Sequence, residues 1–482
     1  SLEEEAYAAA EDDGVTITAK MLEDDDELKK LRSVTAKELV KARNRIIESI
    51  KDQAMRSSKE GAIPFEELGI DMVLVDEVHE FKTPPISTRM NMKGLNTQTS
   101  NRSIALQFIT RYIRANNNGG NVHTFTGTPI TNTLTEIFHQ MRYVMEDEMK
   151  SAGVDTWDGW FGSFAKEVQD VELSAAGEYE AVTRLAGFIN VPELRRMIGQ
   201  YMDVVFADDM PEMQPRRVNG KTMASADLTE AERAELLNGR TEGAMDRPYK
   251  KVVNVTSDLT PEQKTIFARL QGYARTWRSM TGKQRKEAMA AGAPESPIIT
   301  EGMANKASFD VRLTRDDEFA GQEGTAPDDP GSKASKVISN VLEIYRSSPD
   351  AAQVIFAEQG YSTSQKRSIG RDAAGNKQFR TVKTFSTMRD IVARLVAQGI
   401  PAEQIAMVDG STSKEKRKEI ADAMNALRIR VVIGSTDTLG VGVNMQRNLR
   451  AMHHMDAPYM PGELEQRNGR GHRQGNAWNT VL

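Results

Sequence analysis

The stretch VLVDEVHEFKT, residues 73–83, determines how the rest of the chain is interpreted. Val73, Leu74 and Val75 are typical of a buried β-strand, and they lead directly into two adjacent carboxylates, Asp76 and Glu77. Nucleotide hydrolases use an acidic pair at the end of such a strand to hold Mg²⁺ and to direct a water at a phosphate. The stretch therefore indicates an α/β fold, and it calls for a phosphate-binding loop elsewhere in the chain.

Length and composition set the broad class of the protein. With roughly 100–200 residues per domain, the 482 residues suggest about three units. The net charge of −6 excludes a uniformly basic nucleic-acid coat but leaves room for a local basic groove. The absence of cysteine excludes disulfides, thiolate metal sites and cysteine nucleophiles. The acidic first residues and the lack of a long apolar run predict a soluble chain without a secretion signal or a membrane span.

Strand and helix patterns alternate in two separate parts of the chain. DMVLVDE, SIALQFITRYI, NVHTFTG and LTEIFHQMRYV follow one another up to about residue 145, and the alternation resumes from QVIFAE at residue 353. The segment between them is Met-rich, helix-prone and broken by Gly/Pro loops. We therefore expect an α/β domain over residues 1–149, a mostly helical insertion or linker over 150–334, and a second α/β domain over 335–482.

Further polar segments occur in a fixed order after the acidic pair. They are TFTGTPITNT at 124–133, TDTLGVGVNMQ at 436–446 and EQRNGRGHRQGN at 465–476. Each one taken alone is typical of a turn or of a charged surface. Together they follow predicted strands, and ligands of open α/β sheets gather at the carboxyl ends of the strands. Their order and placement favour one shared site.

These segments carry a family resemblance. The chain resembles superfamily 2 helicases, and specifically the Swi/Snf-type translocases of double-stranded DNA: DEVH looks like the DEAH box, TGTPITNTLTEIF like the third motif and LEQRNGRGHRQGN like the sixth. FEELGIDMVLVDEVHEFKT and DDPGSKASKVISNVLEIY are similar to the helicase part of large phage and plasmid proteins that join a motor to a methyltransferase-like region, some of them anti-restriction proteins. The resemblance implies two RecA-like lobes, the first one incomplete, around the helical insertion.

The resemblance assigns roles to residues on both lobes. Asp76 and Glu77 would hold Mg²⁺ and orient the attacking water, so they are both the catalytic and the metal residues of lobe 1. Arg470 and Arg473 would act as arginine fingers on the phosphates of ATP, since a guanidinium is always charged and matches phosphate oxygens. The ATP-binding frame of lobe 2 would comprise Gly440, Gly442, Gln466 and Gly469.

Other residues would couple ATP to DNA. His79, Thr126, Gly127 and Thr128 would transmit the nucleotide state between the lobes. Lys82, Ser411 and Thr436 would contact the DNA backbone, although surface roles are an alternative for them. Basic residues near the fifth and sixth motifs predict salt-sensitive duplex binding without sequence preference; they are Arg428, Arg430, Arg447 and Arg450.

The phosphate-binding loop itself is missing from the sequence. Its pattern, GxxxxGK[ST], lets backbone N–H groups wrap the phosphates while the lysine reaches the terminal ones. The GKT at 220–222 fails because Pro215 stands at the first glycine position and no strand pattern precedes it, and TGKQ at 281–284 has Gln284 in place of the hydroxyl. We expect the loop upstream, in a larger polypeptide of which this chain is a window; a degenerate, non-hydrolysing relative is the other interpretation.

The sequence therefore predicts an ATP-dependent double-stranded DNA translocase or helicase module of a larger phage- or plasmid-type protein. ATP and Mg²⁺ are the expected cofactors. Double-stranded DNA and the rest of the same polypeptide, which would include a methyltransferase-like region, are the expected partners. The expected location is the bacterial cytoplasm or a phage virion. The alternative is a non-hydrolysing structural or cargo protein of a virion that retains the helicase fold.

Overall fold

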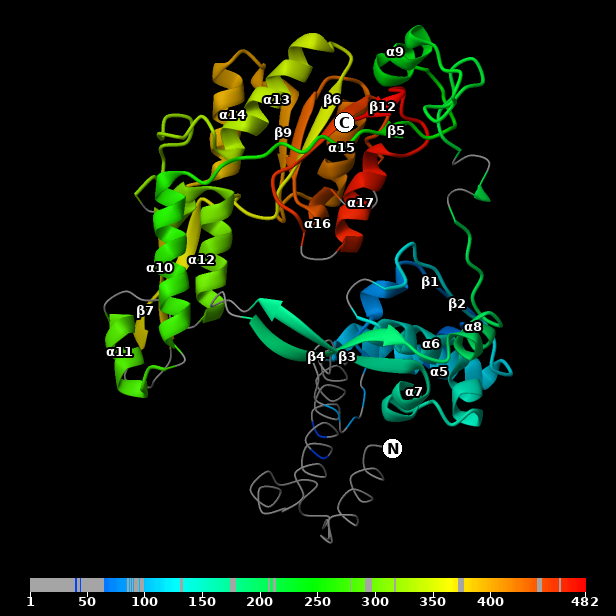
Figure 1. Ribbon diagram of the computed structural model, residues 1–482. Coiled ribbons are helices and arrows are strands. Elements are labelled where there is room, and N and C mark those ends of the chain that lie inside the picture. The colour runs from blue at the N-terminus through cyan, green and yellow to red at the C-terminus, as the bar shows by residue number, and fades with distance from the viewer. Residues whose placement is uncertain are drawn as a thin grey trace. The chain divides into compact units, whose positions relative to one another are not determined.

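A computed structural model (Figure 1) shows the chain as two compact units, which are described separately. Unit 1 comprises Ser1–Glu172 and Glu180–Val204, and unit 2 comprises Leu173–Tyr179 and Val205–Leu482. The structure describes residues 40, 44, 65–84, 86, 88, 90, 95, 99–130, 133–173, 179–206, 209–210, 214–277, 279–290, 297–315, 318–371, 377–439, 444–458 and 461–482.

The sheet of unit 1 confirms the strand, helix, strand order of the first α/β pattern. Strand β1 (Val73–Val75) pairs in parallel with β2 (Val122–Thr124), with Val75 opposite Thr124. The connection between them contains α5 (Asn101–Asn116), whose first turn is capped by the Ser100 side chain. Because both strands run in the same direction, the acidic pair after β1 and the polar segment after β2 emerge at the same edge of the sheet.

An aromatic cluster forms the main core of unit 1. It joins α6 (Thr135–Ser151) to α7 (Trp157–Phe164), and the rings of Trp157 and Trp160 stack at 5.5 Å with Phe138 packed against both. The chain continues into a two-stranded sheet of β3 (Ala165–Leu173) and β4 (Tyr179–Phe188), followed by α8 (Val191–Ile198). The sequence predicted a mostly helical segment here, and the β3–β4 ribbon was not anticipated.

Unit 2 contains a four-stranded parallel sheet in the order β11–β6–β10–β9, of which β6 and β9 are labelled in Figure 1. The side chains of the central strands alternate between two cores: Ile355 and Ile433 face one, and Val354, Phe356 and Val432 face the other. This burial on both faces explains why the strand sequences are continuous apolar runs. The strands are β6 (Ala352–Phe356), β9 (Ile405–Val408), β10 (Val431–Gly434) and β11 (Leu449–His454).

Helices cover both faces of this sheet. Helices α13 (Lys333–Ser347) and α14 (Thr387–Ala397) contribute apolar residues to the first core, and α15 (Lys414–Asn425) contributes to the second. The predicted α/β class, with RecA-like parallel-sheet lobes, is confirmed in this arrangement. The other helices and strands of unit 2 are α9 (Glu230–Asn238), β5 (Tyr249–Lys250), α10 (Pro261–Trp277), α11 (Gly282–Ala290), α12 (Pro297–Phe309), β7 (Ser364–Arg371), β8 (Lys377–Lys383), α16 (Thr436–Leu439), α17 (Pro461–Gly471) and β12 (Thr480–Val481).

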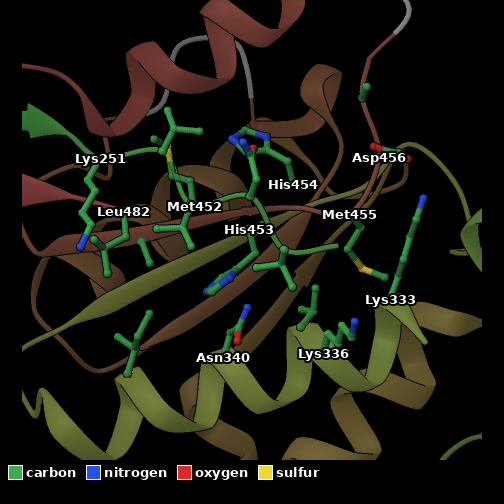
Figure 2. A pocket seen from close by; sticks show the side chains of 18 of the residues that line it. Lys251, Lys333, Lys336, Asn340, Met452, His453, His454, Met455, Asp456 and Leu482 are labelled. Carbon is green, nitrogen blue, oxygen red and sulfur yellow. The ribbon is translucent and has the colours of Figure 1, made fainter. Parts of the chain in front are cut away.

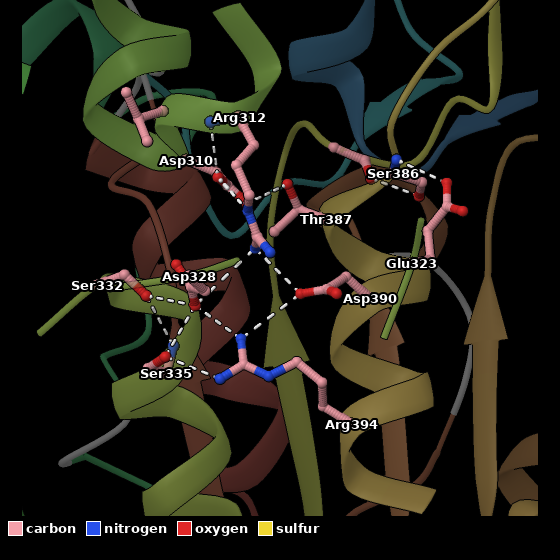
Figure 3. A network of polar contacts seen from close by, with 12 residues as sticks. Asp310, Arg312, Glu323, Asp328, Ser332, Ser335, Ser386, Thr387, Asp390 and Arg394 are labelled. Atoms are coloured by element: carbon pink, nitrogen blue, oxygen red, sulfur yellow. Dashed lines mark hydrogen bonds and ion pairs between the residues drawn. The ribbon is translucent and has the colours of Figure 1, made fainter. Parts of the chain in front are cut away.

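A buried ion network fastens the segment after α12 to the second α/β domain (Figure 3). The guanidinium of Arg312 lies 2.9 Å from a carboxylate oxygen of Asp310 and 3.0 Å from one of Asp390, and it also lies over the ring of Phe385. Asp328 accepts hydrogen bonds from Arg394, Ser332 and Ser335 in the same network. The three acidic side chains are each less than 10% exposed, so their charges depend on the two arginines.

Across the described residues, no helix is both long enough and apolar enough to cross a lipid bilayer.

Candidate functional site

The acidic pair of unit 1 lies at the carboxyl end of β1, as predicted. Asp76 and Glu77 are both exposed, and the Asp76 carboxylate accepts a hydrogen bond from the backbone N–H of Glu77 at 2.9 Å. Glu77 adopts the left-handed conformation, with φ 51° and ψ 48°, which is uncommon for a residue with a long side chain. The chain then turns directly into a short 3₁₀ helix, Val78–Phe81.

His79 connects this acidic turn to the segment after β2. Its Nδ1 lies 3.0 Å from the Thr126 hydroxyl and 3.4 Å from the Thr128 hydroxyl, and a Glu77 carboxylate oxygen lies 3.3 Å from the same nitrogen. The backbone N–H of Thr128 donates to the Thr126 hydroxyl at 3.0 Å, which closes the turn around Gly127. The structure therefore brings the coupling residues predicted from the two motifs into one contiguous cluster.

Lys82 lies just beyond this cluster and points to a carboxylate of its own unit. Its Nζ is 3.9 Å from the Glu136 carboxylate, and its side chain is 28% exposed, against 4% for Glu136. Because a buried glutamate partly balances its charge, this lysine would attract a DNA phosphate less strongly. The contact of Lys82 with DNA stays a prediction.

The GKT sequence at 220–222 is a tight turn rather than a phosphate cradle. Val218 and Lys221 pair across it, with Asn219 and Gly220 at positive φ. The Lys221 ammonium lies 3.0 Å from the Glu232 carboxylate, and Glu232 closes the capping box of α9. The lysine thus stabilises a helix N-terminus, which agrees with the rejection of this segment on sequence grounds.

Arg467 organises the corresponding edge of unit 2. Its side chain is fully buried, and its guanidinium donates to Glu358 at 2.6 Å, to the Thr436 hydroxyl at 2.7 Å and to the backbone oxygen of Asp456 at 3.0 Å. Glu358 follows β6, Thr436 follows β10 and Asp456 follows β11. Arg467 therefore fixes helix α17 against the carboxyl ends of neighbouring strands.

The charges of this cluster respond to their surroundings. Burial tends to raise the pKa of Glu358, but the hydrogen bonds from Thr436 and Arg467 outweigh it and hold the pKa below its ordinary value. Burial raises the pKa of Asp456 despite the nearby Arg467. The sequence analysis did not single out Glu358, Asp456 and Arg467, although Glu358 ends the quoted strand QVIFAE and Arg467 stands in the sixth motif.

The predicted arginine fingers lie at the end of α17. Arg470 is in the last turn of the helix, and Arg473 follows the end of the helix. The guanidinium of Arg473 donates a hydrogen bond to the side-chain oxygen of Asn444 at 3.1 Å. Gln466 is half-buried on the same helix, and Gly469 is exposed, with open space where a Cβ would stand. Gly440 and Gly442 lie outside the described residues.

The structure gives several of the predicted DNA contacts other partners. Thr436 is only 4% exposed, and its hydroxyl is held between Glu358 and Arg467, so this side chain is not on a surface open to DNA. Arg430 and Arg450 are equally buried and donate to backbone carbonyls of their own unit. Ser411 is exposed, but its hydroxyl donates to Asp409 at 2.6 Å in the turn after β9.

A pocket of about 780 Å³ lies in unit 2, between α13 and the end of β11 (Figure 2). Lys333 and Lys336 from α13 line one side of it. His453, which is hydrogen-bonded to Gln353, and His454 come from β11. The pocket contains none of the predicted site residues, so the candidate chemistry is not located there.

The carboxylates of unit 1 suit magnesium in kind and number. Mg²⁺ prefers oxygen ligands and in nucleotide sites is held by one or two carboxylates, substrate phosphates and several waters. Asp76 and Glu77 provide such a pair at an exposed turn. In the part of the chain that the structure describes, no cluster of three or more acidic or histidine side chains could hold a metal by itself.

Comparisons with known proteins agree with these motifs. Residues 6–205 match the family described as a probable helicase domain, and residues 368–475 match the helicase conserved C-terminal domain. The chain is 22% identical over 510 residues to the Defense against restriction protein B of Escherichia phage P1; the match covers 90% of this chain and 22% of the length of the phage protein.

Solved structures of ATPase domains also match parts of the chain. The C-terminal part of the Fun30 ATPase domain matches with a TM-score of 0.33 at 16% identity, over 49% of this chain and 85% of that one. The Sulfolobus solfataricus SWI2/SNF2 ATPase core, solved with double-stranded DNA, matches with a TM-score of 0.31 at 14% identity, over 85% and 62% of the two chains. The two helicase matches and the phage relative support the resemblance to superfamily 2 helicases, close to anti-restriction proteins, that the motifs indicate.

Proposed function

We propose that the chain is the motor part of an ATP-dependent translocase on double-stranded DNA. The single observation that carries this proposal is the cluster at the sheet edge of unit 1, where the exposed Asp76 and Glu77 adjoin His79, Thr126 and Thr128. A purely structural turn has no need of two exposed carboxylates at the end of a parallel strand, held next to a histidine that contacts the neighbouring strand's loop.

The roles of these residues follow from their positions. Asp76 would hold Mg²⁺, with Glu77 beside it, and the bound metal would neutralise charge on the phosphates. Glu77 would orient the attacking water and accept its proton. His79 would sense any movement of Glu77, since it lies 3.3 Å from that carboxylate, and pass it to the Thr126 hydroxyl at 3.0 Å.

In unit 2, Arg467 has a positioning role. Its buried contacts hold α17 against the strand ends, and α17 in turn carries Gln466, Gly469 and Arg470, with Arg473 immediately after it. Arginine fingers need a rigid base, because a guanidinium displaced by about 1 Å loses much of its effect on the transition state. We assign the phosphate contacts themselves to Arg470 and Arg473.

The phosphate-binding loop is part of this proposal. No GxxxxGK[ST] pattern occurs in the 482 residues, and the chain spans 22% of the length of its phage relative. We propose that the loop belongs to the longer protein, upstream of the DEVH segment, together with the partner regions of that protein. Most of the affinity for ATP would then come from outside this chain.

The test measures phosphate release by two proteins, residues 1–482 alone and a version extended upstream, each with and without duplex DNA. The extended protein should bind and hydrolyse ATP, and DNA should stimulate its turnover, whereas residues 1–482 alone should do neither. Asp76→Asn and Glu77→Gln are the matched variants, and each should abolish turnover of the extended protein. Robust turnover by residues 1–482 alone would show that the phosphate-binding loop is not upstream of this chain but within it.

The sequence also supports a second candidate, a non-hydrolysing structural or cargo protein of a virion. The observation in its favour is again the missing GxxxxGK[ST] pattern. The same assay separates the two, because a cargo protein would stay silent in both versions. Fractionation of infected bacteria would then test the proposed location in the cytoplasm or the virion.

A further inference from the structure

Strands β7 and β8 form an antiparallel ribbon inserted between β6 and α14 of the second α/β domain (β7 in Figure 1). None of the described apolar side chains of the ribbon is buried, and Phe379 is 56% exposed. A two-stranded ribbon is only marginally stable by itself, and this one gains little from packing of its apolar residues. Packing of the core therefore does not account for the residues that the ribbon carries.

The ribbon is strongly basic within an acidic protein. Six of the 20 residues from Ser364 to Lys383 are lysine or arginine and one is aspartate, whereas the whole chain has a net charge of −6. The described side chains of Lys366, Arg380 and Lys383 are all exposed, and none of them forms an ion pair with another residue that the structure describes.

The backbone register pairs basic positions of the two strands, Arg367 with Arg380 and Arg371 with Lys377. Like charges at opposite positions of an antiparallel pair are in general unfavourable, and a bound polyanion relieves such repulsion.

One face of the ribbon is open to solvent along its described length. Lys366, Phe379 and Lys383 lie on this face with Ser364 and Thr381, and all five side chains are exposed. The opposite face includes Gln365 and Val382, which are half-buried, and Arg380, which is exposed. The open face thus combines cations for phosphates with an aromatic ring for sugar or base contacts.

We propose that the open face of the β7–β8 ribbon is a DNA-binding arm that contacts the phosphate backbone of duplex DNA, outside the helicase motifs. A two-stranded ribbon is narrow enough to lie along the major groove, where phosphates line both sides. The inference rests on the proposed function for its choice of duplex DNA. Its residues belong to none of the motifs that assign ATP or DNA contacts.

The test uses the 482-residue chain and a labelled 30-base-pair duplex at several salt concentrations. The double variant Lys366→Gln, Lys383→Gln removes the two described cations of the open face. The matched control, Lys250→Gln, Lys251→Gln, removes two exposed cations elsewhere in unit 2. If the arm binds DNA, the ribbon variant should make the plot of log affinity against log salt less steep by about 2, since each phosphate contact contributes about 0.9. The control should change the slope by less than 1.

The outcomes separate this inference from the proposed function. Unchanged affinity and slope in the ribbon variant, with the parent chain binding duplex, would overturn the arm and leave the translocase proposal intact. A parent chain that binds no duplex would overturn both. Stronger competition by single-stranded DNA of equal phosphate number would refute the choice of duplex. The conservative variant Lys366→Arg, Lys383→Arg keeps both charges and should retain the affinity of the parent chain. It shows whether substitution at these positions disturbs the fold.

Discussion

Replacement of Arg467 by methionine tests whether a buried arginine holds the motif helix α17 in place. The guanidinium is fully buried and donates to Glu358 at 2.6 Å, to Thr436 at 2.7 Å and to the Asp456 backbone at 3.0 Å. Methionine has a similar length, so the change removes the charge and its hydrogen bonds while leaving most of the volume filled. The carboxylates of Glu358 and Asp456 would then lose their shared cation.

The size of the effect follows from the exposure of these carboxylates. Removing one partner of a buried ion pair costs about 3–5 kcal/mol when the other charge stays buried. The Asp456 side chain is 15% exposed, but that of Glu358 is 38% exposed and can recover part of its hydration from water. We therefore expect a loss at the lower end of the range, about 3 kcal/mol.

Native-state hydrogen exchange measures this loss where it should occur. Amides of β11 and α17 should open more easily in Arg467→Met by the expected free energy, while those of α5 and α6 in unit 1 should not change. Arg346→Met is the matched control, because Arg346 is exposed and, among the described residues, donates only to the backbone oxygen of Gln398 at 3.3 Å. A loss below about 1 kcal/mol, or one equal to that of the control, would refute the role assigned to Arg467.

Three further perturbations have defined outcomes. Burial and the nearby Arg142 lower the pKa of His139 to about 3 from 6.5; the unfolded state therefore binds the extra proton first, and unit 1 should lose about 2 kcal/mol between pH 7 and pH 5. In His139→Gln, the melting curves at pH 7 and pH 5 should converge. If the difference between them is the same as in the parent chain, groups other than His139 cause the loss of stability. Arg312→Met should lower the free energy of unfolding of unit 2 by about 3–5 kcal/mol in a urea titration, because Asp390 is fully buried, and a near-neutral result would contradict the network's importance. In the extended protein, Arg470→Ala or Arg473→Ala should lower the hydrolysis rate roughly 10³-fold with folding intact, whereas a rate within a few-fold of the parent's would make these arginines surface residues.

The sequence predicted strands where apolar residues follow one another. QVIFAE became β6, a central and buried strand of the unit 2 sheet, and VLV became β1, although Leu74 is 64% exposed. The β3–β4 ribbon gave no such signal. In β3, Val168 and Val171 stand three residues apart, a spacing that also suits a helix, and Val171 is 61% exposed. An exposed ribbon needs no alternation of apolar and polar residues, so its sequence carries little evidence of its strands.

The candidate site was predictable where its members are close in sequence or belong to a motif. His79 and Thr126 were assigned to one coupling cluster, and their side chains lie 3.0 Å apart. The partners of Arg467 were not found, because Glu358 is 109 residues away and an ion pair of that separation leaves no periodic pattern. The same reason explains the DNA contacts first expected of Arg430 and Arg450: a basic residue near a motif looks the same in sequence whether it faces solvent or caps buried carbonyls.

The carboxylates at the strand ends have an arginine partner in unit 2 but no lysine or arginine partner among the described residues of unit 1. This difference bears on which carboxylates face a ligand. In unit 2, Glu358 and Asp456 share the buried cation of Arg467, so their charges are balanced within the protein. In unit 1, neither Asp76 nor Glu77 forms an ion pair with a lysine or arginine among the described residues, and both are exposed. Adjacent carboxylates without a cation repel each other, and a divalent metal relieves that repulsion while using the same oxygens as ligands. The strand ends of unit 2 therefore hold helix α17, whereas the end of β1 keeps negative charge that suits the Mg²⁺ we propose for this site.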